Sequence, residues 1–152
     1  MNKNLFAIAL LVLATAFATT SCNKDEDPKT NAELILGSWK VTAASVSPEI
    51  PIVGTDVYSY LYEECDKDDI SIFEDNGVLK IDEGASKCNA NDPQTVTGTY
   101  LFNPTQTVIT INDGSGPESF NVVELGESVM RISYSENVAG TDYTYTVTFT
   151  KQ

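Results

Sequence analysis

An unbroken alternation of side-chain character near the C-terminal end constrains the fold of this chain most strongly. Over residues 142–150, aromatic or apolar residues alternate with polar ones, most of them threonines. Because successive side chains of a β-strand point to opposite faces of its sheet, this segment predicts a strand with one buried face and one solvent-exposed face. The residues predicted to share the buried face are Tyr143, Tyr145, Val147 and Phe149.

Shorter runs rich in β-branched and aromatic residues recur along the preceding part of the chain. The first, residues 35–44, is predicted to place Trp39 and Ala43 on one face of a strand. Asn76-Gly77 lies between two such runs, and this pair is typical of a tight β-hairpin because both residues tolerate positive φ angles. Further turns are predicted at residues 103–105, 112–117, 126 and 137–140.

Together these runs predict an all-β domain of eight antiparallel strands. Sequential hairpins favour an up-and-down meander, and closing the meander into a barrel removes its exposed strand edges. Eight strands form a barrel whose interior is filled by side chains or holds one small ligand. A two-sheet sandwich is the alternative. Residues 57–65, within the long segment after the first strand, are expected to contain a helical turn.

The N-terminal segment predicts an exported, lipid-anchored protein. Residues 1–21 contain a lysine, an apolar run and a small-residue site, the pattern of a cleavable export signal. Cys22 follows at a position that resembles the lipidation site of bacterial lipoproteins; an ordinary secretory leader with an incidental cysteine is the alternative. We therefore predict a signal peptide over 1–21, a lipidated acidic tether over 22–32 and one folded domain over 33–152.

The first charged residues after Cys22 indicate where the protein is sorted. Lys24, Asp25 and Glu26 resemble the Lys-acidic-acidic signal that directs lipoproteins of one Gram-negative phylum to the outer face of the outer membrane. We expect display at the cell surface, with the periplasmic face of the outer membrane as the alternative. A solvated linker without a sorting role would also explain these charges.

The chain is strongly acidic, with 22 acidic residues, 9 basic residues and a net charge of −13. Removal of the predicted leader takes away one lysine and no acidic residue, which makes the net charge −14. Such a surface repels nucleic acid and anionic lipid head groups. We therefore expect no nucleic-acid partner, and a monomer that meets the membrane through the lipid on Cys22.

Cysteine and histidine usage narrows the chemistry further. The chain has no histidine, which excludes Ser-His-Asp and Cys-His nucleophile arrangements and removes a common zinc ligand. Lipidation of Cys22 leaves Cys65 and Cys88, and an oxidising compartment predicts a disulfide between them. The chain-entropy model assigns such a crosslink roughly 3.5 kcal/mol. Two free thiols are the alternative.

Acidic residues are densest between positions 63 and 83, where nine of them accompany two lysines. Carboxylates suit Ca²⁺, so Asp66, Asp68 and Asp69 are weak calcium candidates, but no stretch has EF-hand spacing. Solvated charge is the interpretation we favour, and we expect no metal and no cofactor. Asp68 and Asp69 are adjacent on a predicted strand and should point to opposite faces, which argues against a catalytic acid–base pair.

Two motifs resemble those of a known family. Gly37-Ser38-Trp39 resembles the Gly-x-Trp signature of lipocalins, in which the tryptophan closes one end of a barrel. Residues 65–69, followed by Asn-Gly and Cys88, resemble the Cys-x-Lys-Asp-Asp pattern of lipocalin-like domains in lipid-anchored proteins of Gram-negative bacteria. The resemblance covers about residues 33–151. Many lipocalins also stack an arginine from a late strand on that tryptophan, and Arg131 is the only arginine here.

The resemblance implies a general binding capacity and names neither a ligand nor catalytic residues. We expect a non-catalytic protein that binds a small apolar molecule. The alternative is a protein–protein module, such as a hydrolase inhibitor or an accessory subunit. A hollow interior favours the first role, and a filled interior with an exposed patch favours the second. The candidate pocket or core residues are Ile35, Trp39, Tyr143, Tyr145, Val147 and Phe149.

We predict that Cys22 carries the lipid. In cells fed a clickable fatty-acid analogue, wild-type protein should be labelled and Cys22→Ala should not, because only Cys22 follows a cleavage site. Cys65→Ala is the matched control and should be labelled like the wild type. Equal labelling of the Cys22→Ala variant would contradict the prediction.

Overall fold

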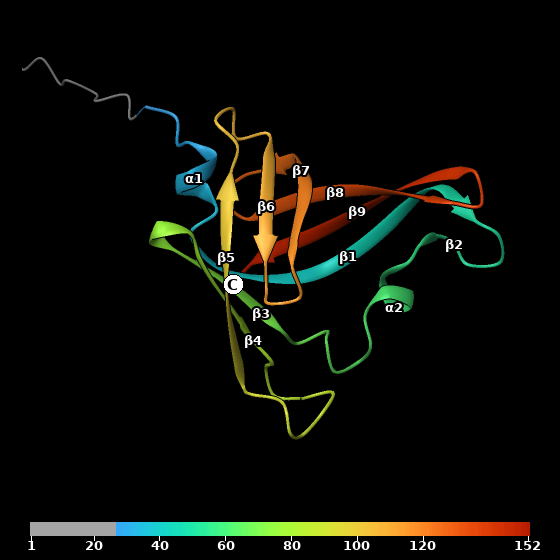
Figure 1. Cartoon of the computed structure of the whole chain (residues 1–152), viewed down its shortest axis with the longest axis horizontal. Coiled ribbons are helices and arrows are strands. Elements are labelled where there is room, and N and C mark those ends of the chain that lie inside the picture. Colours follow the sequence, from blue (N-terminus) through green and yellow to red (C-terminus); the bar gives the residue numbers. More distant parts are fainter. Residues whose placement is uncertain (1–26) are drawn as a thin grey trace, which may run out of the picture.

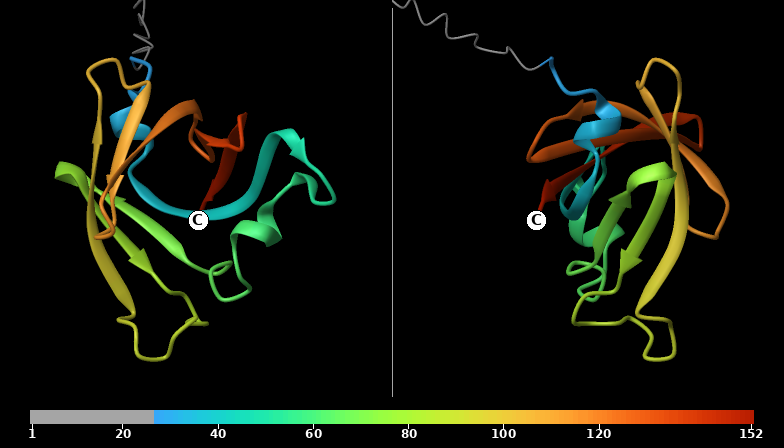
Figure 2. Two further views of the ribbon diagram at one scale, coloured as in Figure 1. Left: turned by 45° about the vertical axis from the view of Figure 1, so that its right-hand side comes forward. Right: turned by 90° about the vertical axis from the view of Figure 1, so that its left-hand side faces the viewer.

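The computed structural model describes residues 27–152, in which nine strands form one antiparallel sheet. Eight of them follow one another around a barrel, and the last strand, β9 (Thr141–Lys151), pairs with the first, β1 (Gly37–Ile50) (Figures 1 and 2). The predicted eight-stranded up-and-down barrel is confirmed, and its closure excludes the two-sheet sandwich. The predicted signal peptide, Cys22 and the sorting signal lie outside the described residues.

Among the described residues, short α-helices lie before β1 and after the first hairpin, and a 3-10 turn (Asp75–Gly77) joins two later strands. None of the helices within residues 27–152 has the length and apolarity needed to cross a membrane. The remaining elements are α1 (Asn31–Leu34), β2 (Gly54–Asp56), α2 (Tyr58–Leu61), β3 (Ile70–Glu74), the 3-10 turn η1 (Asp75–Gly77), β4 (Val78–Asp82), β5 (Thr95–Phe102), β6 (Val108–Asn112), β7 (Pro117–Leu125) and β8 (Val129–Val138).

The first strand differs from the prediction in its bounds and in the face it buries. The expected strand over 35–44 was wrong at both ends, because Ile35 caps α1 and β1 continues to Ile50. A register shift between Val41 and Ala43, in the pairing with β9, marks a β-bulge. An extra residue reverses the alternation of side chains beyond it. Ala44 is therefore buried, and Ala43, which was predicted on the inner face, is exposed.

The hairpin predicted at Asn76-Gly77 is confirmed. Both residues have positive φ angles, 66° and 76°. Glu74 of β3 faces Val78 of β4, so η1 joins the two strands directly. The helical turn expected after the first strand is also present, as α2.

One end of the barrel is closed by packed side chains and by α1. Trp39 and Ile35 are fully buried there, and the Trp39 indole N–H donates a hydrogen bond to the Ile35 carbonyl oxygen at 2.6 Å. The Asn31 side-chain amide donates to the Gln106 carbonyl oxygen at 2.9 Å, which fixes α1 against the β5–β6 turn. Other large residues that fill this end are Phe73, Leu79, Tyr100, Ile109 and Met130.

A lysine covers Trp39 where the family resemblance suggested an arginine. Lys151 Nζ lies 5.0 Å from the Trp39 ring centre, within cation–π range, and donates to the Leu34 carbonyl oxygen at 3.1 Å. Gly37 leaves room for this side chain, because a Cβ there would come within 3.0 Å of Lys151 Cε. Arg131 instead forms a half-exposed ion pair with Glu124.

Beyond the barrel, β1, β2, β8 and β9 continue as a long ribbon, with α2 beneath it (Figure 1). Val57, just before α2, is fully buried, and its N–H donates to the Ala44 carbonyl oxygen at 3.0 Å. Val57 and Ala44 form a second, smaller core with Val46 and Tyr145. The barrel end opposite α1 is therefore covered on one side by the ribbon and α2.

Gly98 on β5 provides a test of this packing. A Cβ at Gly98 would lie 2.2 Å from the Asn112 carbonyl oxygen, so Gly98→Ala is expected to lower the free energy of unfolding by roughly 1–3 kcal/mol. Gly126→Ala is the matched control, since its Cβ would meet only the Val129 oxygen at 3.8 Å. Trp39 is the only tryptophan, so its fluorescence during urea unfolding measures both variants. Equal stability of the two variants would contradict the packing described.

Candidate functional site

A cavity of about 440 Å³ lies at the end of the barrel opposite α1. α1 contacts the β5–β6 turn, whereas the cavity is lined by Ser115 and Gly116 of the β6–β7 turn, at the other end of β6. The volume lies in the range of small-molecule sites, about 300–1,000 Å³. Most of the lining is apolar or aromatic: Val41, Leu61, Tyr62, Ile81, Ile111, Phe120, Ile132, Tyr134, Val147 and Phe149.

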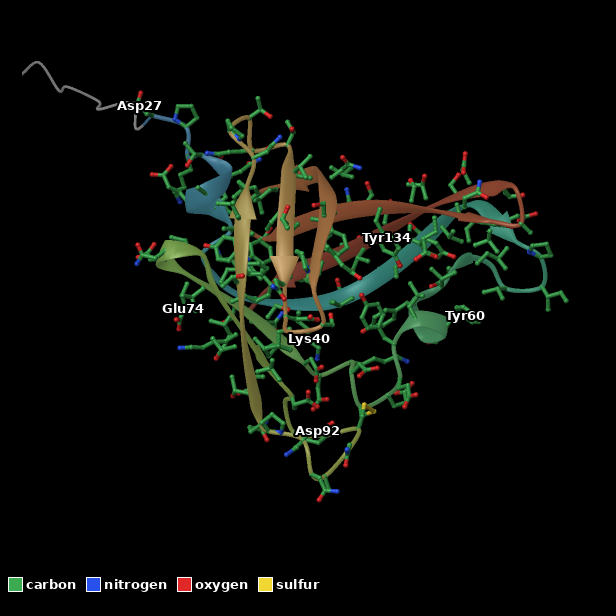
Figure 3. The ribbon with its side chains drawn as sticks, viewed as in Figure 1. Asp27, Lys40, Tyr60, Glu74, Asp92 and Tyr134 are labelled. Carbon is green, nitrogen blue, oxygen red and sulfur yellow. A yellow bond between two sulfur atoms is a disulfide. The ribbon has the colours of Figure 1, made fainter. Side chains whose placement is uncertain are left out.

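Aromatic side chains form one wall of the cavity. Tyr134 of β8 stacks on Tyr145 of β9, with ring centres 5.1 Å apart, and meets the ring of Phe120 of β7 edge-on at 5.8 Å. Figure 3 places Tyr134 on the side of β8 that faces α2. Tyr62 follows α2, and burial raises the pKa of its hydroxyl to about 12. The Tyr62 hydroxyl is protonated at neutral pH, as that of an ordinary tyrosine also is, and can donate a hydrogen bond.

The structure distributes the six predicted pocket or core residues over different parts of the interior. Val147 and Phe149, on the inner face of β9, line the cavity. The other four pack as core, at the closed end or under the ribbon: Ile35, Trp39, Tyr143 and Tyr145.

Sequence reasoning missed three aromatic residues of the cavity wall. Phe120 and Tyr134 lie on strands that were predicted, and Tyr134 continues the alternation of the buried Met130 and Ile132. The alternation of residues along β8 could therefore have predicted that Tyr134 faces the interior. Tyr62 lies in an irregular segment without periodicity, and only the path of the chain after α2 brings it to the cavity.

Carboxylates border the apolar wall. The acidic residues that line the cavity are Asp66, Asp69, Asp113 and Glu118, and no lysine or arginine of the described chain lines it. Oδ1 of Asp69 is buried and has no hydrogen-bond partner among residues 27–152. Burial raises the pKa of the Asp69 carboxyl to about 6, and four neighbouring carboxylates add to the shift: Glu83, Asp66, Asp68 and Asp82.

Two of the weak calcium candidates hold loops in place. Asp66 accepts a hydrogen bond from the Glu63 N–H at 2.8 Å. One oxygen of Asp68 accepts from the N–H groups of Ala85 and Ser86, at 2.7 and 3.0 Å, which secures the β4–β5 loop. Part of the acidic cluster therefore serves to anchor loops through these hydrogen bonds.

The predicted disulfide between Cys65 and Cys88 is present. It joins the segment after α2 to the β4–β5 loop, beside the acidic rim of the cavity (Figure 3). Within residues 27–152, the one close group of potential metal ligands consists of Glu63 and these two cysteines. Since both sulfurs are held in the disulfide, this group is not a thiolate metal site. The structure does not bring Asp66, Asp68 and Asp69 together around one point.

Solved structures and a family model are similar to this chain. A solved structure of bovine odorant-binding protein with a selenium-containing odorant is similar, with a TM-score of 0.45 and 14% identity over 85% of this chain and 77% of that one. The bovine protein with undecanal gives a TM-score of 0.46 and 14% identity, over 84% and 77%. No curated protein matches. A family model described as a lipocalin-like domain matches residues 35–132, and the chain therefore belongs to the lipocalin-like domain family.

Proposed function

We propose that this protein is a lipid-anchored binding protein that holds a small apolar molecule in its barrel and does not catalyse a reaction. The observation that carries the proposal is the cavity of about 440 Å³ with a mainly apolar and aromatic lining. Moving an apolar molecule from water onto such walls is favourable by about 25 cal/mol per Å² of surface buried. Membership of the lipocalin-like family supports the same role.

The hollow end of the barrel favours ligand binding over the protein–protein role. Trp39, Leu79 and Ile109 fill the closed end, whereas the interior at the other end is open. Among the described residues, the lining supplies hydroxyl and carboxyl groups but no imidazole, thiol or amine. A few polar groups within a mainly apolar lining suit the orientation of a bound ligand.

The described chain begins at the end of the domain opposite the cavity. The described chain begins at Asp27, next to α1 at the closed end (Figure 3). An ion pair between Lys29 and Glu127, at 2.7 Å, attaches this segment to the β7–β8 turn. A lipid on Cys22 would therefore leave the cavity facing away from the membrane, toward molecules that arrive from the medium.

Surface display is testable through the tether. A protease recognition sequence inserted between Pro28 and Lys29 should allow an added protease to release the domain from intact cells, because the tether would lie outside the outer membrane. A periplasmic lipoprotein with the same insertion should be cleaved only after the outer membrane is opened. Protection of both proteins in intact cells would favour the periplasmic face.

Cavity binding is testable with an uncharged fluorescent probe. N-phenyl-1-naphthylamine should bind the wild type with increased emission. Ser71 of β3 lines the cavity, so Ser71→Phe should weaken probe binding at least tenfold by occupying the space. Thr97→Phe, on the exposed face of β5, adds the same ring to the outer surface and should bind like the wild type.

Both variants should unfold at a urea concentration close to that of the wild type. Any shift of the midpoint should be no larger than a single surface or cavity substitution normally causes. Unchanged probe affinity in Ser71→Phe would show that the probe binds elsewhere. Absence of probe binding to the wild type would count against the proposed function itself.

A further inference from the structure

The charged side chains at the cavity all carry the same sign. They come from two parts of its rim: Asp66 and Asp69 before β3, and Asp113 and Glu118 around the β6–β7 turn. Lys67, although close in sequence to the first pair, forms an ion pair with Glu64 and lies 5.3 Å from the ring centre of Tyr58. A rim lined by one sign of charge attracts ligands of the opposite sign and repels those of the same sign.

Asp69 differs from two of these carboxylates because the described residues leave its Oδ1 without a hydrogen-bond partner. Asp113 accepts hydrogen bonds from the N–H and hydroxyl of Ser115, at 3.0 and 2.6 Å, and Asp66 accepts one from the Glu63 N–H. Oδ1 of Asp69 is buried and accepts none from residues 27–152. Burying one oxygen of a carboxylate without a hydrogen-bond partner costs free energy, and a cation that approaches the carboxylate offsets that cost.

The aromatic wall suits the same kind of ligand. Tyr62, Phe120 and Tyr134 line the cavity together with the carboxylates. Their rings can contact an apolar chain, and their faces attract an ammonium group through cation–π interaction. A fatty acid would gain the same apolar contacts but would bring its carboxylate among like charges.

We infer that the cavity selects amphiphilic amines, with an ammonium group contacting the Asp69 carboxylate and an apolar body lying against the aromatic wall. This inference rests on the proposed function, since it names the class of molecule that the same cavity holds. It also gives the acidic cluster a role beyond loop anchoring.

The test compares three ligands with one eight-carbon chain and different head groups: octylammonium, 1-octanol and octanoate. Each displaces N-phenyl-1-naphthylamine from the wild-type domain at pH 7.5 and 150 mM salt, which screens the overall negative charge beyond about 8 Å. Octylammonium should displace the probe at a concentration roughly tenfold lower than 1-octanol, and octanoate should be the weakest. Equal displacement by octylammonium and 1-octanol would overturn the inference.

Two variants distinguish the effect of the Asp69 carboxylate from the effect of the protein's net charge. Asp69→Asn should abolish the preference for octylammonium over 1-octanol while leaving the affinity for 1-octanol unchanged. Asp75→Asn makes the same substitution in the turn between β3 and β4, at the closed end, and should retain the full preference. Retention of the preference in Asp69→Asn, or an equal loss in both variants, would overturn the role of Asp69.

Separate control measurements test whether the variants fold and whether the proposed function holds. Trp39 fluorescence in urea should show that Asp75→Asn unfolds like the wild type and that Asp69→Asn is at least as stable as the wild type, since Asp69 Oδ1 has no hydrogen bond to lose. If the uncharged probe binds but the three octyl ligands show no charge preference, the amine inference fails and cavity binding stands. If neither the probe nor any octyl ligand binds the wild type, the proposed function fails with it.

Discussion

The pairing of β9 with β1 is the interaction on which the rest of the structure depends. The two strands run side by side from Trp39 opposite Lys151 to Ser47 opposite Thr144. Without this pairing, both strands would be open edges of a curled sheet. Closure separates an inner face from solvent, so the alternating residues of eight strands pack into one interior. It also brings Lys151 over Trp39 and thereby completes the closed end.

The same strand explains why the barrel is filled at one end and hollow at the other. Before the bulge, β1 pairs with β3 and β9 and directs Trp39 into a core of large side chains. After the bulge, β1 no longer pairs with β3 and continues with β9 into the ribbon. A bulge bends its strand and increases the local twist. The cavity lies where β1 and β3 are no longer paired, and it is lined by Val41, by the small Ser71 and by the carboxylate Asp69.

Periodicity in the sequence predicted most of the fold but only part of the site. The alternation in β9 and the Asn76-Gly77 turn are local signals, and both predictions were correct. Val147 and Phe149 reach the cavity as members of that alternation. The prediction for β1 failed at Ala43 because a bulge depends on the partner strand rather than on local residue preference. Tyr62 lies in an irregular segment whose sequence has no hydrophobic periodicity, so its position at the cavity could not be predicted from the sequence.

By itself, the sequence determined the class of fold, the number of barrel strands, the cysteine pair and the strongly acidic charge. These follow from local alternation, turn residues and composition, each visible in the residues themselves. Only the tertiary structure decided that Lys151 rather than Arg131 covers Trp39, and that Asp69 borders an apolar cavity with its Oδ1 unpaired among the described residues. The physical reason is register: which distant side chains meet inside a barrel depends on how closure aligns its strands, and a shift of one residue turns each side chain to the other face.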